Sequence, residues 1–219
     1  MVDLRSGTMR LYVFALLLFL LVLGVFESVE GRRTRFKPKP KEKKTEKSVE
    51  EITPAKDINI NQIGGKWYLL TVASRCQHLL EKGFKVESTI INLTPPVSPR
   101  SPLKVSTFTK LNYQCWEIKQ NYETTNSTGR FLLKGNMPVM NVEILIIDTD
   151  YSSYAILLYK RMKKITMKLY GRSTQVPEAI QDKYEELARK HNLGLDLNFQ
   201  FPDYGFCESA DKEHTLVMT

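Results

Sequence analysis

Residues 142–170 read VEILIIDTDYSSYAILLYKRMKKITMKLY, three short apolar runs separated by polar turns. The runs at 142–147, 154–159 and 164–170 are rich in β-branched and aromatic side chains, which favour strands. The turns between them are short, as in hairpins that join neighbouring antiparallel strands. This stretch therefore predicts an antiparallel sheet whose consecutive strands lie side by side.

The same pattern repeats upstream and extends the expected sheet to eight strands. Trp116, Ile118 and Gln120 alternate with their neighbours and therefore share one face of a strand. The five additional runs are 66–74, 86–93, 103–111, 115–122 and 130–134. Eight short strands with turns between them are typical of an all-β sandwich or barrel.

One helix is expected after the last strand, where the period of the apolar residues changes. Pro177 can begin a helix because its missing N–H costs nothing in the first turn, and Gly194 can end it. The apolar face consists of Ile180, Tyr184, Leu187 and His191. These positions share one side of a helix, so we expect the helix to pack on the outside of the strands.

Three separated segments resemble motifs of the lipocalin family. Gly65-Lys66-Trp67 opens the first expected strand, and Thr149-Asp150-Tyr151 lies between the sixth and seventh. Leu169-Tyr170-Gly171-Arg172 ends the eighth strand. Each motif alone is common, but all three in this order on eight strands and one helix are specific.

The resemblance implies an all-β lipocalin domain over residues 58–219. Its fold would be an eight-stranded antiparallel up-and-down barrel (calyx) with one C-terminal α-helix packed outside. Trp67 would close the narrow end with Arg172 across it, a cation–π contact worth about 0.5–2 kcal/mol. The barrel-closing structural motif would consist of Gly65, Trp67, Thr149, Asp150, Tyr151 and Arg172.

The sequence contains no arrangement of residues typical of catalysis or metal binding. His78, His191 and His214 are far apart and lack the spacing of metal ligands, and no glycine-rich phosphate loop is present. One lipocalin branch isomerises a prostaglandin with a cysteine inside its barrel, but Cys76 does not match that position. We therefore expect a binding protein that is not an enzyme, with no cofactor and no metal ion.

Residues 1–31 are typical of a secretory signal peptide. Arg5 and Arg10 precede an almost unbroken apolar run over 11–26, and Val29 to Gly31 offers small residues for cleavage. An uncleaved membrane anchor is the alternative, but this run is shorter than the about 20 residues that a span needs. We expect a secreted protein that does not itself insert into a membrane.

Residues 32–57 are expected to form a basic, disordered tail. The segment 32–51 carries nine Lys or Arg against four Glu, whereas 52–219 carries 21 against 17 Asp or Glu. Arg32 to Lys47 has no apolar periodicity and cannot bury enough surface to offset its ordering entropy. A solvated tail is the favoured interpretation, and a basic arm for polyanions or an acidic protein is the alternative. A secreted chain would not meet intracellular nucleic acid, so we expect no nucleic-acid partner.

The chain has three cysteines, Cys76, Cys115 and Cys207, so one is left over in an oxidising compartment. An odd cysteine suggests an intermolecular bond or a free thiol, and the residues alone leave every pairing open. The lipocalin resemblance implies that Cys115 pairs with Cys207. Cys76 would then form an interchain disulfide; a reactive redox thiol and an inert or capped thiol are the alternatives.

Further segments resemble one branch of the family, a subunit of an innate-immune assembly of blood plasma. They are 106–111, 115–116, 130–133 and 204–208. That branch implies a covalent bond from Cys76 to a larger chain whose assembly makes pores in membranes. A second branch shares the cysteine and the 168–172 stretch, and it implies a reactive thiol or transport of a small hydrophobic ligand.

The interior of such a calyx is either filled by side chains or holds one small ligand. The aromatic candidates to line or fill it are Phe108, Tyr122, Phe131 and Tyr159. A segment of the partner chain at the mouth is the alternative occupant. Two sequons suit a secreted glycoprotein: Asn126 lies in a polar turn, and Asn92 ends an apolar run.

Overall fold

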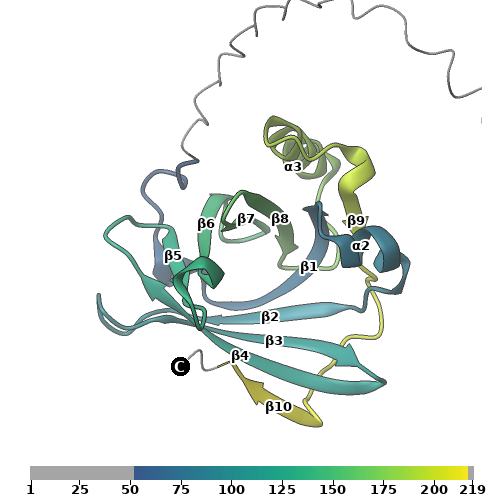
Figure 1. The fold of residues 1–219 in the computed structure, drawn as a ribbon, viewed down its shortest axis with the longest axis horizontal. Helices are drawn as coiled ribbons and strands as arrows, with labels where there is room; N and C mark the ends of the chain where they lie inside the picture. The colour runs from purple at the N-terminus through teal and green to yellow at the C-terminus, as the bar shows by residue number, and fades with distance from the viewer. Residues whose placement is uncertain (1–51, 217–219) are drawn as a thin grey trace, which may run out of the picture. The chain divides into compact units, whose positions relative to one another are not determined.

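The computed structural model describes residues 52–216, whose strands close into a barrel (Figure 1). The barrel strands are β1 (Gly65–Ser74), β2 (Thr89–Thr94), β3 (Leu103–Leu111), β4 (Gln114–Thr124), β5 (Arg130–Leu133), β6 (Val142–Thr149), β7 (Tyr154–Arg161) and β8 (Lys164–Gly171). Each pairs antiparallel with the next, and β8 returns to β1. The predicted eight-stranded up-and-down barrel is confirmed.

Among residues 52–216, two α-helices accompany the barrel: α2 (Gln77–Lys82) follows β1, and α3 (Glu178–Lys190) follows β8. α3 lies outside the barrel, over β7 and β8 (Figure 1). Its buried residues Tyr184 and Ala188 pack in one core with residues of β7 and β8, and the Tyr184 hydroxyl donates to the Met167 carbonyl at 3.1 Å. This confirms the C-terminal helix. Sequence analysis missed α2, which is too short to show a helical period. Four 3₁₀ turns complete the helices: η1 (Ile60–Ile63), η2 (Gly83–Lys85), η3 (Pro138–Met140) and η4 (Leu195–Leu197).

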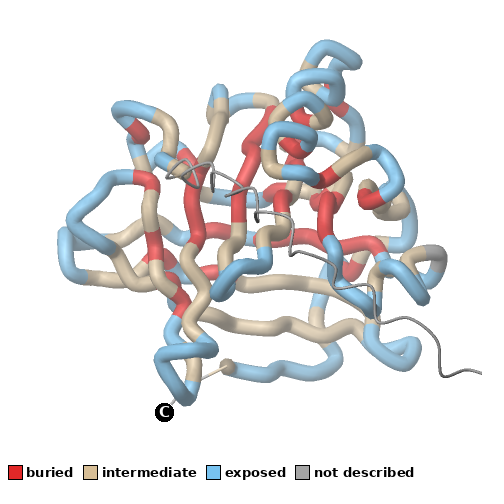
Figure 2. The backbone as a smooth tube through the Cα atoms, turned by 45° about the horizontal axis from the view of Figure 1, so that its top comes forward, coloured by how far each residue is buried: buried red, intermediate tan, exposed pale blue. Residues whose placement is uncertain are grey.

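Apolar side chains form two cores, one inside the barrel and one beneath α3. Figure 2 shows in red the buried stretches of backbone. Alternate residues of a strand point to opposite faces. Leu157 of β7 therefore lies inside, and its neighbour Leu158 lies under the helix. Strands buried on both faces read as continuous apolar runs, as 154–159 does. β3 and β4 are mostly half-buried, so the barrel is covered less completely there.

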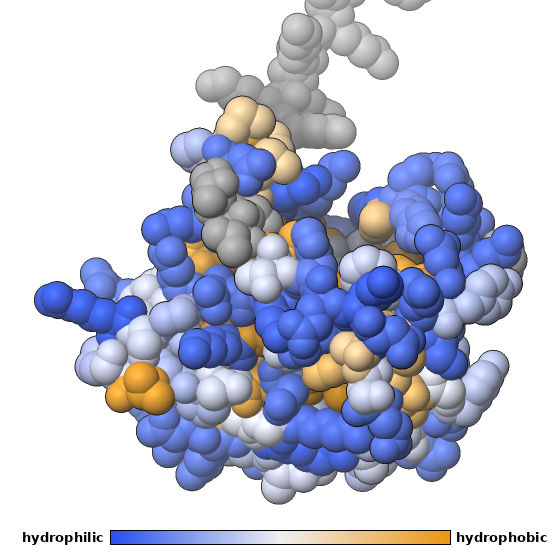
Figure 3. Space-filling view, turned by 90° about the horizontal axis from the view of Figure 1, so that it is seen from below, coloured by the Kyte–Doolittle hydropathy of each residue, from blue (hydrophilic) through white to orange (hydrophobic). Residues whose placement is uncertain are grey.

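Two short strands lie outside the ring. β9 (Asn198–Gln200) pairs with β1, and β10 (Lys212–Thr215) runs parallel to β4. In the described chain, β5 pairs with β4 only at Glu123 and Thr124, which leaves the rest of that edge of β4 for β10. Seen from below, the surface of the molecule is mostly hydrophilic with small apolar patches (Figure 3). Among the described residues, no helix combines the length and apolarity needed to span a bilayer.

Residues 52–57, which sequence analysis placed in the disordered tail, lie against the barrel. The Ala55 N–H donates to the Ile146 carbonyl at 2.9 Å, and the Ile52 carbonyl accepts from the Arg130 guanidinium at 3.4 Å. Ile52 and Ala55 also pack against the two cores, which gives these apolar side chains a reason to be ordered. The ordered domain therefore begins before residue 58. The expected signal peptide and residues 32–51 lie outside the described residues.

A disulfide between Cys115 and Cys207 ties the C-terminal segment to the outside of the barrel, with the two Cα atoms 5.6 Å apart. Of the pairings that the sequence left open, this is the one that the lipocalin resemblance implied. The Asp211 N–H donates to the Cys115 carbonyl at 2.8 Å, and the Cys115 N–H donates to the Asp211 carboxylate at 2.9 Å. These bonds place β10 beside β4.

Removing this disulfide should lower the free energy of unfolding by about 4 kcal/mol, because it closes a loop of 92 residues in the unfolded chain. We expect guanidinium unfolding of a Cys115→Ser/Cys207→Ser double variant to show this loss. Cys76→Ser is the control and should unfold like the parent chain. Equal midpoints for the double variant and the parent would contradict a stabilising role of the bond.

Candidate functional site

Arg172 organises the closed end of the barrel by lying across the ring of Trp67. The guanidinium carbon is 3.7 Å from the ring centre, which makes a cation–π contact. The guanidinium also donates to three carbonyls, those of Tyr151 and Lys66 at 3.0 Å and that of Gln62 at 3.3 Å. Trp67 is fully buried, and its indole N–H donates to the last carbonyl of η1 at 2.8 Å. Arg172 thereby joins η1, β1 and the β6–β7 turn to the end of β8.

The other motif residues shape the backbone around this contact. Gly65 has a φ of +91°, and a Cβ there would lie 3.2 Å from the guanidinium, so glycine suits both the backbone and the space. In the β6–β7 turn, the Asp150 carboxylate accepts from the N–H groups of Ser153 at 2.8 Å and Tyr154 at 3.0 Å. Burial alone would raise the pKa of Asp150, but these hydrogen bonds outweigh it and hold the pKa below its usual value. The Thr149 hydroxyl donates to the Tyr154 carbonyl at 2.7 Å and completes the turn.

The opposite end of the barrel opens into a calyx. Inward-facing Trp67 and Leu103 near the closed end are buried, whereas inward-facing Thr107, Trp116 and Ile118 nearer the mouth are half-buried. Inward-facing side chains are therefore less buried near the mouth than near the closed end. Hydroxyl pairs line this upper wall, at 2.8 Å between Ser74 and Thr166 and at 3.2 Å between Thr89 and Thr109. The inner wall is therefore partly polar and half-buried near the mouth, above an apolar and buried floor.

Three of the four aromatic calyx candidates lie inside the barrel. Tyr122 and Phe131 are buried in the inner core, and Tyr159 packs against that core. The rings of Tyr122 and Tyr159 meet edge to face with centroids 6.5 Å apart, and the hydroxyls of Tyr159 and Tyr170 are 3.4 Å apart. Burial raises the pKa of both Tyr122 and Tyr159, so these phenols stay neutral.

Phe108 is the exception, because its side chain lies on the outer face of β3. Leu103 and Val105 of the same strand point into the inner core, and Phe108 is an odd number of residues from each. Its cross-strand partners are Ile90 and Glu117, which also face outward. The prediction that Phe108 lines the calyx is therefore wrong. The alternation was visible in the sequence, but a shift of one residue exchanges the two faces.

Lys168 points into the calyx between two apolar neighbours. Its cross-strand partners Val72 and Leu157 both belong to the inner core, and opposite residues of paired strands share a face. Its Nζ lies 4.4 Å from the centre of the Tyr159 ring. Burial lowers the pKa of Lys168 to about 8. Between residues 52 and 216, no carboxylate forms an ion pair with it, so the calyx holds a cation without a counter-charge.

Cys76 lies exposed at the mouth, between β1 and α2, as a free cysteine. Its N–H donates to the Ser74 hydroxyl at 3.1 Å, and its carbonyl accepts from the Leu80 N–H at 3.0 Å. The neighbouring Arg75 donates to the Asn192 carbonyl at 2.7 Å, which anchors this loop to the end of α3. The backbone at Cys76 is thus held in place while the thiol faces solvent and can react with a second chain.

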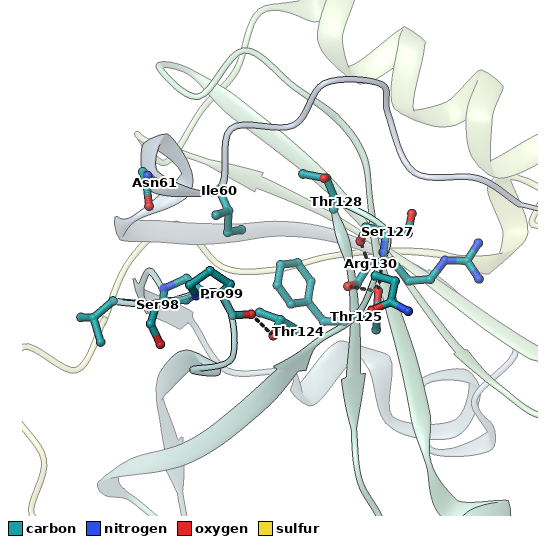
Figure 4. A pocket seen from close by; sticks show the side chains of 14 residues that line it. Ile60, Asn61, Ser98, Pro99, Thr124, Thr125, Ser127, Thr128 and Arg130 are labelled. Atoms are coloured by element: carbon teal, nitrogen blue, oxygen red, sulfur yellow. Dashed lines mark hydrogen bonds between the residues drawn. The ribbon is translucent and has the colours of Figure 1, made fainter.

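A separate hollow of about 400 Å³ lies between the loops at the closed end (Figure 4). The Thr124 hydroxyl donates to the Pro99 carbonyl at 3.0 Å across its edge. Phe131 of the inner core lines it, whereas Cys76 and Lys168 near the mouth do not. Asn126 of the first sequon lines this hollow and is exposed, and Asn92 of the second is exposed on the outer face of β2. No three His, Cys, Asp or Glu side chains gather to hold a metal ion in the part of the chain described.

Sequence analysis missed Lys168 as a site residue, although its signal was present. Lys168 alternates with Met167 and Leu169 and therefore lies on the opposite face from them. The pattern alone did not tell which face of β8 is inner, because α3 buries the outer face with Met167 and Leu169, whereas Thr166 and Lys168 on the inner face are half-buried.

Barrel topology and closed-end motif together define the class: the chain belongs to the lipocalin / cytosolic fatty-acid binding protein family, whose model matches residues 64–203. It is 36% identical over 169 residues to complement component C8 gamma chain of Oryctolagus cuniculus, which covers 77% of this chain and 82% of that one. It is 29% identical over 172 residues to Protein AMBP of Bos taurus, covering 75% of this chain and 48% of that protein, and so spans about half of its length. A solved structure of the siderocalin Ex-FABP superposes on this chain with a TM-score of 0.57 at 23% sequence identity. The match covers 66% of this chain and 96% of that one, and it supports the fold of this chain but not its function.

Arg172→Ala should destabilise the barrel by about 2–3 kcal/mol, because it removes the cation–π contact and the donor to three carbonyls. Arg161→Ala is the matched control: this arginine is exposed at the mouth and should change stability by no more than about 0.5 kcal/mol. Chemical unfolding measures both. A loss for Arg172→Ala as small as that of the control would contradict the structural role of the contact.

Proposed function

We propose that this chain is a non-enzymatic, secreted lipocalin subunit of blood plasma, equivalent to the gamma chain of complement component eight. In this proposal Cys76 forms an interchain disulfide with the alpha chain of component eight. A beta chain joins the alpha chain without a covalent link to this one. The assembly takes part in forming the membrane attack complex, in which the partner chains insert into the target membrane.

The observation that carries this proposal is the exposed, unpaired Cys76 at the mouth of the barrel. The other two cysteines are bonded to each other, so Cys76 is the thiol left for a second chain. The 36% identity to a complement C8 gamma chain supports the same assignment.

Co-expression with a complement C8 alpha chain tests the proposal directly. We expect non-reducing electrophoresis to show a covalent adduct of the two chains that reduction separates. Cys76→Ser should abolish the adduct, because it removes the exposed thiol, while the refolded barrel keeps its circular dichroism. Persistence of the adduct in Cys76→Ser, or no adduct with the parent chain, would overturn the assignment.

A second candidate function is binding of a small hydrophobic ligand in the calyx, as in an alpha-1-microglobulin-like or transport lipocalin with Cys76 as a reactive thiol. Lys168 is the observation that favours it. A cation among Val72, Leu157 and the Tyr159 ring fits the acidic head of an amphipathic molecule. The half-buried upper wall gives such a molecule access from the mouth.

We expect a fluorescent long-chain carboxylate to bind more tightly below pH 8 than above it, because Lys168 loses its proton as the pH rises through about 8. Lys168→Met should weaken binding and remove this pH dependence. The alcohol of the same chain length is the control and should show neither effect. Fluorescence titration of both ligands between pH 6 and 10 makes the measurement, and equal pH profiles for parent and variant would exclude Lys168 as the anion partner.

A further inference from the structure

The turn between β7 and β8 gathers unpaired positive charge at the mouth. We call Lys160–Lys164 the basic hairpin; it has four cations in five residues. Arg161, Lys163 and Lys164 are exposed, and none of them forms an ion pair with any of residues 52–216. Lys160 alone has an acidic neighbour, with its Nζ 3.9 Å from the Glu143 carboxylate. Like charges held this close repel one another, so this hairpin favours an acidic partner.

Exposed apolar side chains adjoin the basic hairpin. We call them the methionine rim: Met137, Val139, Met140 and Met162, which are 55%, 50%, 40% and 67% exposed. Pairing of Glu143 with Lys160 brings the β5–β6 loop beside the hairpin, and Asn141 and Met162 line the same surface depression. Flexible methionine side chains adapt to a partner surface and are common at binding sites. Exposed apolar surface of this kind is unfavourable in water unless a partner covers it.

Cys76 lies next to this surface. Ser74 pairs with Thr166 at the end of the β1–β8 ladder. Cys76 follows Ser74 by two residues, and Lys164 precedes Thr166 by two, so the thiol and the basic hairpin are at the same end of neighbouring strands. A chain bonded to the Cys76 sulfur is therefore within reach of the hairpin.

We propose that the basic hairpin and the methionine rim bind an acidic segment of the disulfide-linked partner, with apolar side chains among its carboxylates. The proposal rests on the proposed function, because Cys76 is what brings that partner to this place. The carboxylates pair with Arg161, Lys163 and Lys164, and the apolar side chains cover Met162 and its neighbours. Docking comes before the disulfide and aligns the two cysteines, since charge complementarity speeds encounter and fixes orientation.

The test uses the full chain with Cys76→Ser, so that only non-covalent docking to a complement C8 alpha chain is measured. In the test variant, Arg161, Lys163 and Lys164 are all replaced by Glu. In the control, Lys56, Arg100 and Lys104 are replaced by Glu; they are exposed and lie away from the mouth, and the change in net charge is the same. At about 0.05 M salt we expect the hairpin variant to associate at least tenfold more slowly and the control less than threefold more slowly, with the difference shrinking at about 0.5 M salt.

The apolar part is tested separately by Met162→Ser, with Val97→Ser as its control because Val97 is 95% exposed in the β2–β3 loop. Met162→Ser should speed dissociation of the alpha chain several-fold, and Val97→Ser should not. Equal association of the two charge variants, while the parent chain still forms the Cys76 adduct, overturns this inference and leaves the proposed function intact. A membrane surface is the other possible acidic partner. The inference would also be overturned if the Cys76→Ser chain bound phosphatidylserine vesicles, and if the hairpin variant lost this binding but still docked to the alpha chain as well as before. Absence of any adduct with the parent chain would overturn both.

Discussion

The stacking of Arg172 on Trp67 is the contact on which the rest of the barrel depends. It closes one end by joining three segments that are far apart in the sequence, and it does so with one guanidinium that also satisfies three backbone carbonyls. The cation covers the indole ring at the floor, and each of the three guanidinium nitrogens donates to a carbonyl. Because one end is sealed in this way, the opposite end can stay open without exposing the inner core.

The open end combines features that a closed, self-sufficient domain would avoid. Lys168 sits inside the calyx without a carboxylate, three cations of the basic hairpin have no ion-pair partner among the described residues, and the methionine rim is exposed. Uncompensated charge and exposed apolar surface both lower stability or solubility. Their concentration at one end, beside the free thiol of Cys76, indicates that this end is built to be covered. A partner chain and an amphipathic ligand compete as explanations for the calyx, but the outer rim fits a protein.

Strand alternation and the three motifs were enough to predict the barrel and its closing contact, because both depend on local pattern and on a well-defined set of residues. Facing was harder. Phe108 was placed inside because it is aromatic, whereas its register with Glu117 puts it outside. Lys168 was overlooked because α3 covers the outer face of β8, so the more apolar face of that strand, with Met167 and Leu169, is the outer one and the polar residues face the calyx. β10 was not predicted either, since Lys212–Thr215 has no apolar residues and is held by its pairing with β4. These features depend on contacts between distant segments, which a linear pattern does not contain.

The central claim is that the mouth of this lipocalin is joined to another chain through Cys76. Mass-spectrometric mapping of non-reduced peptides from the protein purified from plasma tests it most directly. The account predicts a peptide containing Cys76 that is disulfide-bonded to a peptide of the complement C8 alpha chain, together with a peptide pair linking Cys115 to Cys207. A Cys76 peptide that carries a free thiol or only a small adduct would contradict it.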